Sequence, residues 1–149
     1  MNLEKIEIYE TDTYQELAEF FIVNGLEFEA EEEVPTDLVK CWRADDPKDG
    51  KLLGGCVLAK REGRFICDGI ATDPSVRGLH LGKKLLDTMI GEARSLDADF
   101  IYLVARAPGF FKKYDFEPIS REEAPTFFEC FSCSQYNNSC FPEVMRLKL

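Results

Sequence analysis

Apolar residues recur along this chain in two patterns, which separate predicted strands from predicted helices. Alternation of apolar and polar residues, or a short apolar run, is typical of a strand, whereas a repeat every three or four positions is typical of an amphipathic helix. Strand patterns occur at residues 3–9, 39–44, 52–60, 65–72, 98–105, 116–119 and 144–149. Helix patterns occur at residues 14–21, 79–93 and 107–114. Strands and helices that alternate in this order predict an α/β protein.

The most informative stretch is residues 65–86, where a strand, a turn and a helix follow one another. Proline has no amide hydrogen to donate to a sheet, so the strand must end before Asp73-Pro74. Apolar residues at helical spacing then form one face of a long helix: Leu81, Leu85, Leu86, Met89, Ile90 and Ala93. The turn between them reads Arg77-Gly78-Leu79-His80-Leu81-Gly82. A glycine-containing turn that opens a helix is a typical phosphate-binding element.

Two common phosphate-binding motifs do not fit this turn. A nucleotide P-loop requires GxxxxGK followed by Ser or Thr, but the chain has one spacer too few and places Lys84 at the hydroxyl position. A dinucleotide fingerprint, GxGxxG, is absent. The turn resembles motif A of the GCN5-related N-acetyltransferases, Q/R-x-x-G-x-G/A. Arg77, Gly78 and Gly82 match that motif, whereas His80 stands where its central glycine is expected.

A side chain at position 80 therefore restricts the backbone conformation of the turn. An αR or β backbone would accommodate its side chain, whereas a positive φ would be unfavourable. The strand-DPxxRGxxLGxxLL context extends the resemblance well beyond the six-residue turn.

The resemblance implies the GNAT, or acyl-CoA N-acyltransferase, fold over one domain, residues 1–149. This α/β fold is a mixed, splayed sheet of about six to seven strands flanked by helices. The implied cofactor is acetyl-CoA. By resemblance, its pantetheine arm lies along Ile70, Ala71 and Thr72, and its pyrophosphate binds the backbone of Gly78, Leu79, His80, Leu81, Gly82 and Lys83. Arg77, with Lys83 or Lys84, would add positive charge, although both lysines could equally be solvated helix residues.

The implied reaction is direct attack by a primary amine of a small molecule or protein on the thioester, which needs a base and an acid. The family's usual acid is the tyrosine of an A-x-x-F-Y-x-K-x-G-F helix, and here Phe111 takes its place, beside the acetyl-CoA site. Tyr114 is the substitute acid, although a packing role is favoured for it. Asp68, a charged residue in an apolar strand, is the candidate base, with a solvent-facing role as the alternative. His80, the only histidine, fits phosphate contact better than proton abstraction, and an exposed residue at the start of the helix is an equal alternative.

Composition restricts the partners. The 149 residues are 45% hydrophobic without a bilayer-length apolar run, and no signal peptide opens the sequence, so we expect a cytoplasmic protein and no membrane partner. A net charge of −10 disfavours nucleic acid. The acidic run at residues 27–33 either attracts a cationic acceptor or is solvated surface. The expected acceptor is a small-molecule amine or an amino acid, and assembly as a homodimer stays open.

The six cysteines form two groups. Cys41, Cys56 and Cys67 lie in apolar strands and are expected to be buried thiols. The tail has the spacing C-x2-C-x6-C, at Cys130, Cys133 and Cys140, and offers zinc three ligands, to which Glu129, Glu143 or another cysteine would have to be added. We expect thiols without metal.

The same tail resembles small N-acetylglutamate-synthase-like members of the superfamily, which points to amino-acid acetylation. The departures at His80 and Phe111 leave a second hypothesis, a CoA-binding regulatory module without transferase activity.

Overall fold

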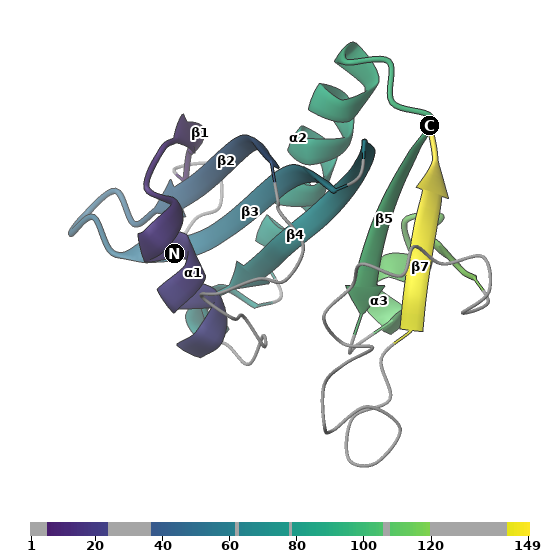
Figure 1. Cartoon of the computed structure of the whole chain (residues 1–149). Coiled ribbons are helices and arrows are strands. Elements are labelled where there is room, and N and C mark those ends of the chain that lie inside the picture. The colour runs from purple at the N-terminus through teal and green to yellow at the C-terminus, as the bar shows by residue number, and fades with distance from the viewer. Residues whose placement is uncertain (1–5, 24–36, 62, 78, 106–107, 120–142) are drawn as a thin grey trace.

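A single mixed sheet forms the centre of the protein. The structure, a computed structural model, describes residues 6–23, 37–61, 63–77, 79–105, 108–119 and 143–149. Its elements are β1 (Ile8–Thr11), α1 (Tyr14–Val23), β2 (Asp37–Asp45), β3 (Leu52–Arg61), β4 (Arg64–Thr72), η2 (Pro74–Val76), α2 (Leu81–Ser95), β5 (Phe100–Ala105), α3 (Pro108–Lys112), β6 (Glu117–Pro118) and β7 (Glu143–Lys148). Seven strands lie in the order β1-β2-β3-β4-β5-β7-β6, and α1 and α2 cover opposite faces (Figure 1).

Strands β4 and β5 are the only parallel neighbours among the described strands; the other described pairs are antiparallel. A parallel pair requires a crossover, and α2 provides it, as the sequence predicted. β4 pairs with β5 at one position, Ile66 with Tyr102. Beyond that position the two strands separate towards their C-terminal ends (Figure 1). The sheet is therefore splayed beside the turn that precedes α2.

A β-bulge interrupts β4 at Asp68. Val57 of β3 pairs with Gly69 and Leu58 pairs with Cys67, so Asp68 is the extra residue on the bulged strand. As a result, Asp68 and Gly69 both face α1, although consecutive strand residues normally face opposite sides. A second irregularity lies in β3, where the β2–β3 register skips Leu53 while Gly54 and Gly55 stay paired.

Three strand glycines allow the helices to approach the sheet closely. A Cβ on Gly69 would lie 2.6 Å from Phe21 Cδ2, and one on Gly55 would lie 2.6 Å from Leu17 Cδ2, so α1 rests on these two positions. On the other face, a Cβ on Gly54 would lie 3.0 Å from Leu85 Cδ1 of α2. The predicted apolar face of α2 is buried in the main core, as the periodicity indicated.

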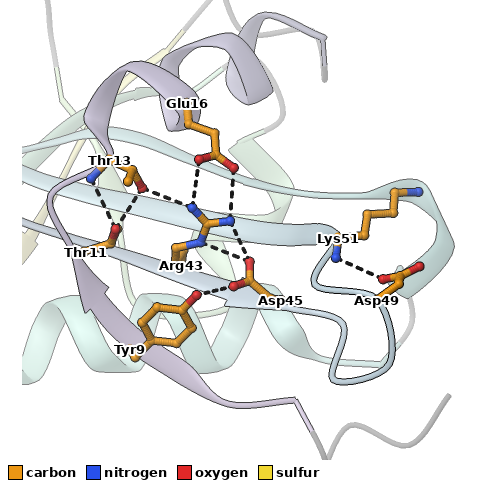
Figure 2. Close-up of polar contacts among 8 residues, drawn as sticks. All are labelled: Tyr9, Thr11, Thr13, Glu16, Arg43, Asp45, Asp49 and Lys51. Carbon is orange, nitrogen blue, oxygen red and sulfur yellow. Dashed lines mark hydrogen bonds and ion pairs between the residues drawn. The ribbon is translucent and has the colours of Figure 1, made fainter.

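The first turn of α1 is fixed to β2 by an arginine network (Figure 2). The Arg43 side chain is 11% exposed and donates to both Glu16 oxygens at 3.0 Å and to Thr13 Oγ1 at 3.1 Å. Its Nε donates to Asp45 Oδ1 at 3.0 Å, and Tyr9 Oη donates to the other Asp45 oxygen. Charge-assisted, bidentate bonds of this kind are strong and directional. They set where α1 starts.

Some predicted boundaries were displaced. The first strand was expected at residues 3–9 but lies at Ile8–Thr11, where it pairs with Cys41 to Ala44 of β2. The strand expected at 116–119 is reduced to Glu117–Pro118. The helix expected at 107–114 is Pro108–Lys112, because Asp115 has φ 69° and its left-handed backbone ends the helical run. Asp115 occupies the glycine position of the motif to which that segment was compared.

The packing of α1 gives a stability prediction. Gly69→Ala should lower the free energy of unfolding by about 1–3 kcal/mol, because the added methyl group overlaps the Phe21 ring. Gly91→Ala is the matched control: Gly91 is exposed within α2, and a Cβ there would have nothing within 4 Å, so this change should raise the free energy by about 0.5–1 kcal/mol. Urea denaturation measures both. Equal stability of Gly69→Ala and the parent would contradict the packing of α1 on β4.

Candidate active site

The segment that joins β4 to α2 is ordered by its own short-range bonds. Asp73 Oδ1 accepts a hydrogen bond from Ser75 N at 2.9 Å, which caps η2. Hydrogen bonds from the Ser75 side chain and then from its backbone lower the pKa of the Asp73 carboxyl. Val76 N and Leu79 N then donate to backbone oxygens of Asp73 and Val76. Arg77 follows η2 with an extended backbone and an exposed side chain. The predicted turn therefore lies at the C-terminal edge of β4. Gly78 is outside the described residues.

His80 adopts the conformation that was expected to be unfavourable. Its φ is 63° and its ψ 22°, a left-handed backbone. The structure thus places His80 in the positive-φ region rather than in the αR or β regions that would accommodate its side chain without strain. A left-handed backbone costs a non-glycine residue roughly 1–2 kcal/mol. The position therefore has the geometry that the motif's central glycine would satisfy without strain.

The N-terminus of α2 has no side-chain cap. His80 is the N-cap residue, but its imidazole makes no capping hydrogen bond. The first intrahelical bond runs from Lys84 N to His80 O at 3.2 Å. Helix geometry leaves the preceding amides, those of Leu81, Gly82 and Lys83, without partners inside the helix. Three amide hydrogens at the positive end of a helix dipole make this site suited to a phosphate group.

Gly82 brings three elements together at this helix end. A Cβ there would lie 3.3 Å from Phe110 Cζ of α3 and 3.9 Å from Thr72 Cγ2 of β4. The glycine therefore allows the end of β4, the start of α2 and α3 to meet, and it leaves the Gly82 amide uncovered by a side chain of its own. Ile70, Ala71 and Thr72, the predicted pantetheine strand, lie directly before this junction.

The cationic side chains near the helix start differ in their surroundings. Lys83 Nζ lies 2.7 Å from Asp87 Oδ2, and this hydrogen bond raises the pKa of Lys83. Arg77 and Lys84 are exposed at the surface. The Lys83 ammonium also lies 6.0 Å from the centre of the Tyr114 ring. The charge that Lys83 can offer a phosphate is thus partly engaged by Asp87.

Phe111 and Tyr114, the two residues linked to the family's acid position, are both half-buried against the core. The Phe111 ring packs edge-on against Phe116 at 5.6 Å between centroids. The Tyr114 ring packs against Phe110 at 5.2 Å. These contacts agree with the packing role favoured for Tyr114, and the acid role proposed for it stays a prediction.

Asp68 lies in a polar cluster on the α1 face of the sheet. Its side chain is 5% exposed, its Oδ2 accepts a hydrogen bond from Tyr14 Oη at 3.1 Å, and its Oδ1 lies 3.5 Å from Arg61 Nη2. The solvent-facing alternative for Asp68 was therefore wrong. Sequence reasoning did not select Tyr14 or Arg61, since Tyr14 is 54 residues away in sequence and read only as the start of an amphipathic helix.

Tyr14 also lines a cavity of about 570 Å³ between the β1–α1 connection and β2. The other lining residues are Glu10, Thr11, Asp12, Leu38, Val39, Lys40 and Cys41. Burial, followed by the negative charge of Asp68, raises the pKa of the Cys41 thiol to about 11. Cys41 is thus a neutral thiol at physiological pH, as expected for a buried cysteine.

Several predicted features lie outside the described residues: the acidic run at 27–33 and the tail cysteines Cys130, Cys133 and Cys140. Within the described ranges, no group of three or more His, Cys, Asp or Glu side chains could hold a metal ion. Cys41, Cys56 and Cys67 are buried free thiols, as predicted. None of the helices in the described segments is long and apolar enough to cross a membrane.

A parallel strand pair that separates beside an uncapped helix N-terminus is suited to binding the phosphate groups of a cofactor. The sequence profile of the acetyltransferase (GNAT) family matches residues 5–116. The chain belongs to this family, and its mixed seven-stranded sheet has the family's fold, as the resemblance predicted. No curated protein sequence matches the chain.

Solved structures with the same fold have low sequence identity to this chain. A GNAT-family acetyltransferase from Staphylococcus aureus Mu50 is 20% identical, with a TM-score of 0.70 over 97% of this chain and 99% of the other. N-acetylglutamate synthase from Neisseria gonorrhoeae, solved with coenzyme A and N-acetylglutamate, is 17% identical, with a TM-score of 0.72 over 97% of this chain but 35% of the synthase. The ribosomal-protein-S18-alanine N-acetyltransferase of Escherichia coli is 16% identical, with a TM-score of 0.66 over 96% and 93%.

The left-handed His80 gives a prediction for this segment. His80→Gly should raise the free energy of unfolding by up to about 1 kcal/mol, because relief of the positive-φ strain exceeds the entropy that glycine gains in the unfolded chain. His80→Ala keeps the Cβ and should give no such gain. Urea denaturation of the two variants and of the parent protein measures these free energies of unfolding. A His80→Gly protein less stable than His80→Ala would contradict the strained backbone.

Proposed function

We propose that this protein is an acetyl-CoA-dependent N-acetyltransferase that transfers an acetyl group to a primary amine by direct attack. The observation that carries the proposal is the uncapped N-terminus of α2 beside the splayed edge of β4. Family membership supports acetyl transfer in general, and the N-acetylglutamate synthase structure contains coenzyme A. The amine acceptor and the residue roles below belong to the proposal.

The residues at the end of β4 and the start of α2 fit acetyl-CoA. The amides of Leu81, Gly82 and Lys83 would hold the pyrophosphate, together with those of Gly78 and His80 in the turn. The Leu79 amide, which the resemblance also assigned to the pyrophosphate, already donates to Val76 O at 3.1 Å. Arg77 and Lys84 are exposed nearby and would add charge. Among the described strands, Ile70 to Thr72 pair with β3 but not with β5, so their β5-facing edge is open to the amides of the pantetheine arm.

Acetyl-CoA supplies a thioester, an activated acyl group with a thiolate as its leaving group. The chain has to hold that group still and take a proton from the attacking amine. The nitrogen–carbon bond forms as the carbon–sulfur bond breaks, and the thiolate then receives a proton. Asp68, at the bulge two residues before Ile70, is the proposed proton acceptor. Its low exposure and its partners Tyr14 and Arg61 fix the carboxylate in place.

The proton for the leaving thiolate has a less obvious source. Phe111 takes the place of the family's tyrosine and has no hydroxyl group. Tyr114 lies beside the α2 start, with its ring 6.0 Å from Lys83 Nζ, and is the proposed donor. Because a thiolate is a tolerable leaving group, protonation by water would also allow turnover.

A second function is favoured by Phe111 and His80, which depart from the family pattern. In that case the protein is a regulatory module that binds CoA without transferring the acetyl group. Both functions require CoA binding, and only the first releases free thiol from acetyl-CoA in the presence of an amine.

Two features of the sequence favour different acceptors. The acidic run at residues 27–33 favours a cationic amine, whereas the tail resemblance favours an amino acid, in line with the N-acetylglutamate bound to the synthase from Neisseria gonorrhoeae. We propose a small molecule as acceptor, cationic rather than acidic, because opposite charge raises the local concentration of substrate. The net charge of −10 further disfavours nucleic acid as a partner.

Cofactor binding is tested by thermal unfolding with CoA. A ligand present at 100 times its Kd stabilises the folded state by about 2.7 kcal/mol, so saturating CoA should raise Tm by several degrees. Gly82→Val should lose most of that shift, because its side chain crowds Phe110 and covers the helix amides. Gly91→Val, on the exposed side of the same helix, is the control and should keep the shift. A wild-type Tm unchanged by CoA would exclude both candidate functions.

Acceptor preference is tested by thiol release from acetyl-CoA with putrescine, lysine, kanamycin and glutamate. We expect the cationic acceptors to exceed glutamate in kcat/KM by about tenfold or more. Changing Glu31, Glu32 and Glu33 to Gln should raise the KM of the cationic acceptors. The pair Glu7→Gln and Glu19→Gln, at two exposed positions of the described residues, serves as the control. Best turnover of glutamate, with the Gln variants unchanged, would show that the acidic run is solvated surface.

A further inference from the structure

Three side chains from three elements meet around the bulge of β4. Tyr14 comes from the first residue of α1, Arg61 from the last residue of β3, and Asp68 from the bulge itself. The Arg61 and Asp68 side chains are 4% and 5% exposed, so both charges are almost fully removed from water. A buried carboxylate requires partners that stabilise its charge.

The contacts that Asp68 makes with Arg61 and with Tyr14 differ in kind. The Arg61 Nη2 to Asp68 Oδ1 distance is 3.5 Å, which is an ion pair but longer than a good hydrogen bond. The Tyr14 Oη to Asp68 Oδ2 distance is 3.1 Å. An ion pair supplies charge with little directional preference, whereas a hydrogen bond from a hydroxyl group depends on angle. Of these two contacts, the Tyr14 hydrogen bond is the one that orients the carboxylate.

Tyr14 is itself held by the fold. Its amide donates to Asp12 O at 2.9 Å, and the neighbouring Thr13 and Glu16 bind the Arg43 guanidinium (Figure 2). Further along α1, Leu17 and Phe21 rest against Gly55 and Gly69. The backbone of Tyr14 is therefore fixed relative to β2, β3 and β4, and its hydroxyl reaches Asp68 from a rigid support.

We propose that Tyr14 is a positioning residue, which holds the Asp68 carboxylate in the orientation that removes the proton from the attacking amine. This inference rests on the proposed function, in which Asp68 is the base. The amine nitrogen loses its proton to the carboxylate, while the Tyr14 O–H bond remains intact and donates to Asp68 Oδ2. Tyr14 thus both lines the 570 Å³ cavity and donates a hydrogen bond to the buried carboxylate.

Charged and titratable groups reach Asp68 from several elements: Arg61 from β3, Tyr14 from α1 and Cys41 from β2. The donated hydrogen bond stabilises the charged carboxylate relative to the neutral form. When it is removed, the carboxylate should bind a proton at higher pH. The acid limb of the pH–rate profile should then move in the same direction, so that less of the enzyme is active at low pH.

Tyr14→Phe removes the hydroxyl group and keeps the ring that packs α1. Its matched control is Tyr9→Phe, because Tyr9 also donates to a carboxylate, that of Asp45, at the outer end of the Arg43 network (Figure 2). The titration of Asp68 is followed by carbon-13 NMR of side-chain carboxyl groups in aspartate-labelled protein, with Asp68→Asn to assign the signal. Steady-state thiol release with putrescine or lysine is measured from pH 5 to 9, and CoA affinity is measured by calorimetry.

For Tyr14→Phe we expect the Asp68 titration and the acid limb to move up by about half to one pH unit, as for loss of one hydrogen bond. We also expect a kcat about tenfold lower at neutral pH, with CoA affinity unchanged. Tyr9→Phe should move neither the titration nor the limb. An unmoved Asp68 titration in Tyr14→Phe would overturn the proposal, as would an unchanged kcat. If the wild-type protein did not bind CoA, the proposed function would be overturned instead. The NMR titration would still report on the hydrogen bond between Tyr14 and Asp68.

Discussion

Strand β4 is the element on which the other parts of this structure depend, because it borders both halves of the sheet. On one side it pairs with β3 from Arg64 to Thr72, and on the other it pairs with β5 at Ile66. A second parallel pair further along would close the gap between β4 and β5. Since the strands separate instead, the C-terminal edge of β4 is left for a ligand, and α2 begins where that edge ends. The bulge at Asp68 turns one additional side chain towards α1, so the same strand presents a backbone edge and a carboxylate.

Two residues at the candidate site have backbone conformations that are unfavourable for a residue other than glycine. His80 and Asp115 both have left-handed backbones, at φ 63° and 69°, and both occupy positions where the family motifs have glycine. The two positions flank the site from different sides, at the start of α2 and after α3. Strain of this kind persists only where the surrounding structure determines the conformation, and it concentrates at ligand-binding turns. The uncapped amides of α2 are a second unsatisfied feature at the same place, and an anion would satisfy them.

The sequence predicted the parts of this site that depend on local patterns. Proline at position 74 and the apolar repeat from Leu81 located the turn to within a residue or two. Asp68 was selected because a charge is unusual within an apolar strand. The sequence indicated that a positive φ at His80 would be unfavourable, but it did not predict that His80 adopts one, because the cost alone does not fix the backbone conformation. Tyr14 and Arg61 were missed because their contacts with Asp68 arise from the packing of α1 and the register of β3, which no short spacing encodes.

Amide chemical shifts of nitrogen-15-labelled protein titrated with CoA test the location of the cofactor site most directly. If β4 and α2 form that site, the largest changes should fall on the amides of Leu81, Gly82 and Lys83, with a second group at Ile70 to Thr72. Amides of β1 and of the exposed side of α2 should remain nearly unchanged. If the largest shift changes instead fell on amides of β1 and β2 while the α2 amides were unaffected, a site at the splayed edge would be contradicted. The ligand would then bind elsewhere on the sheet.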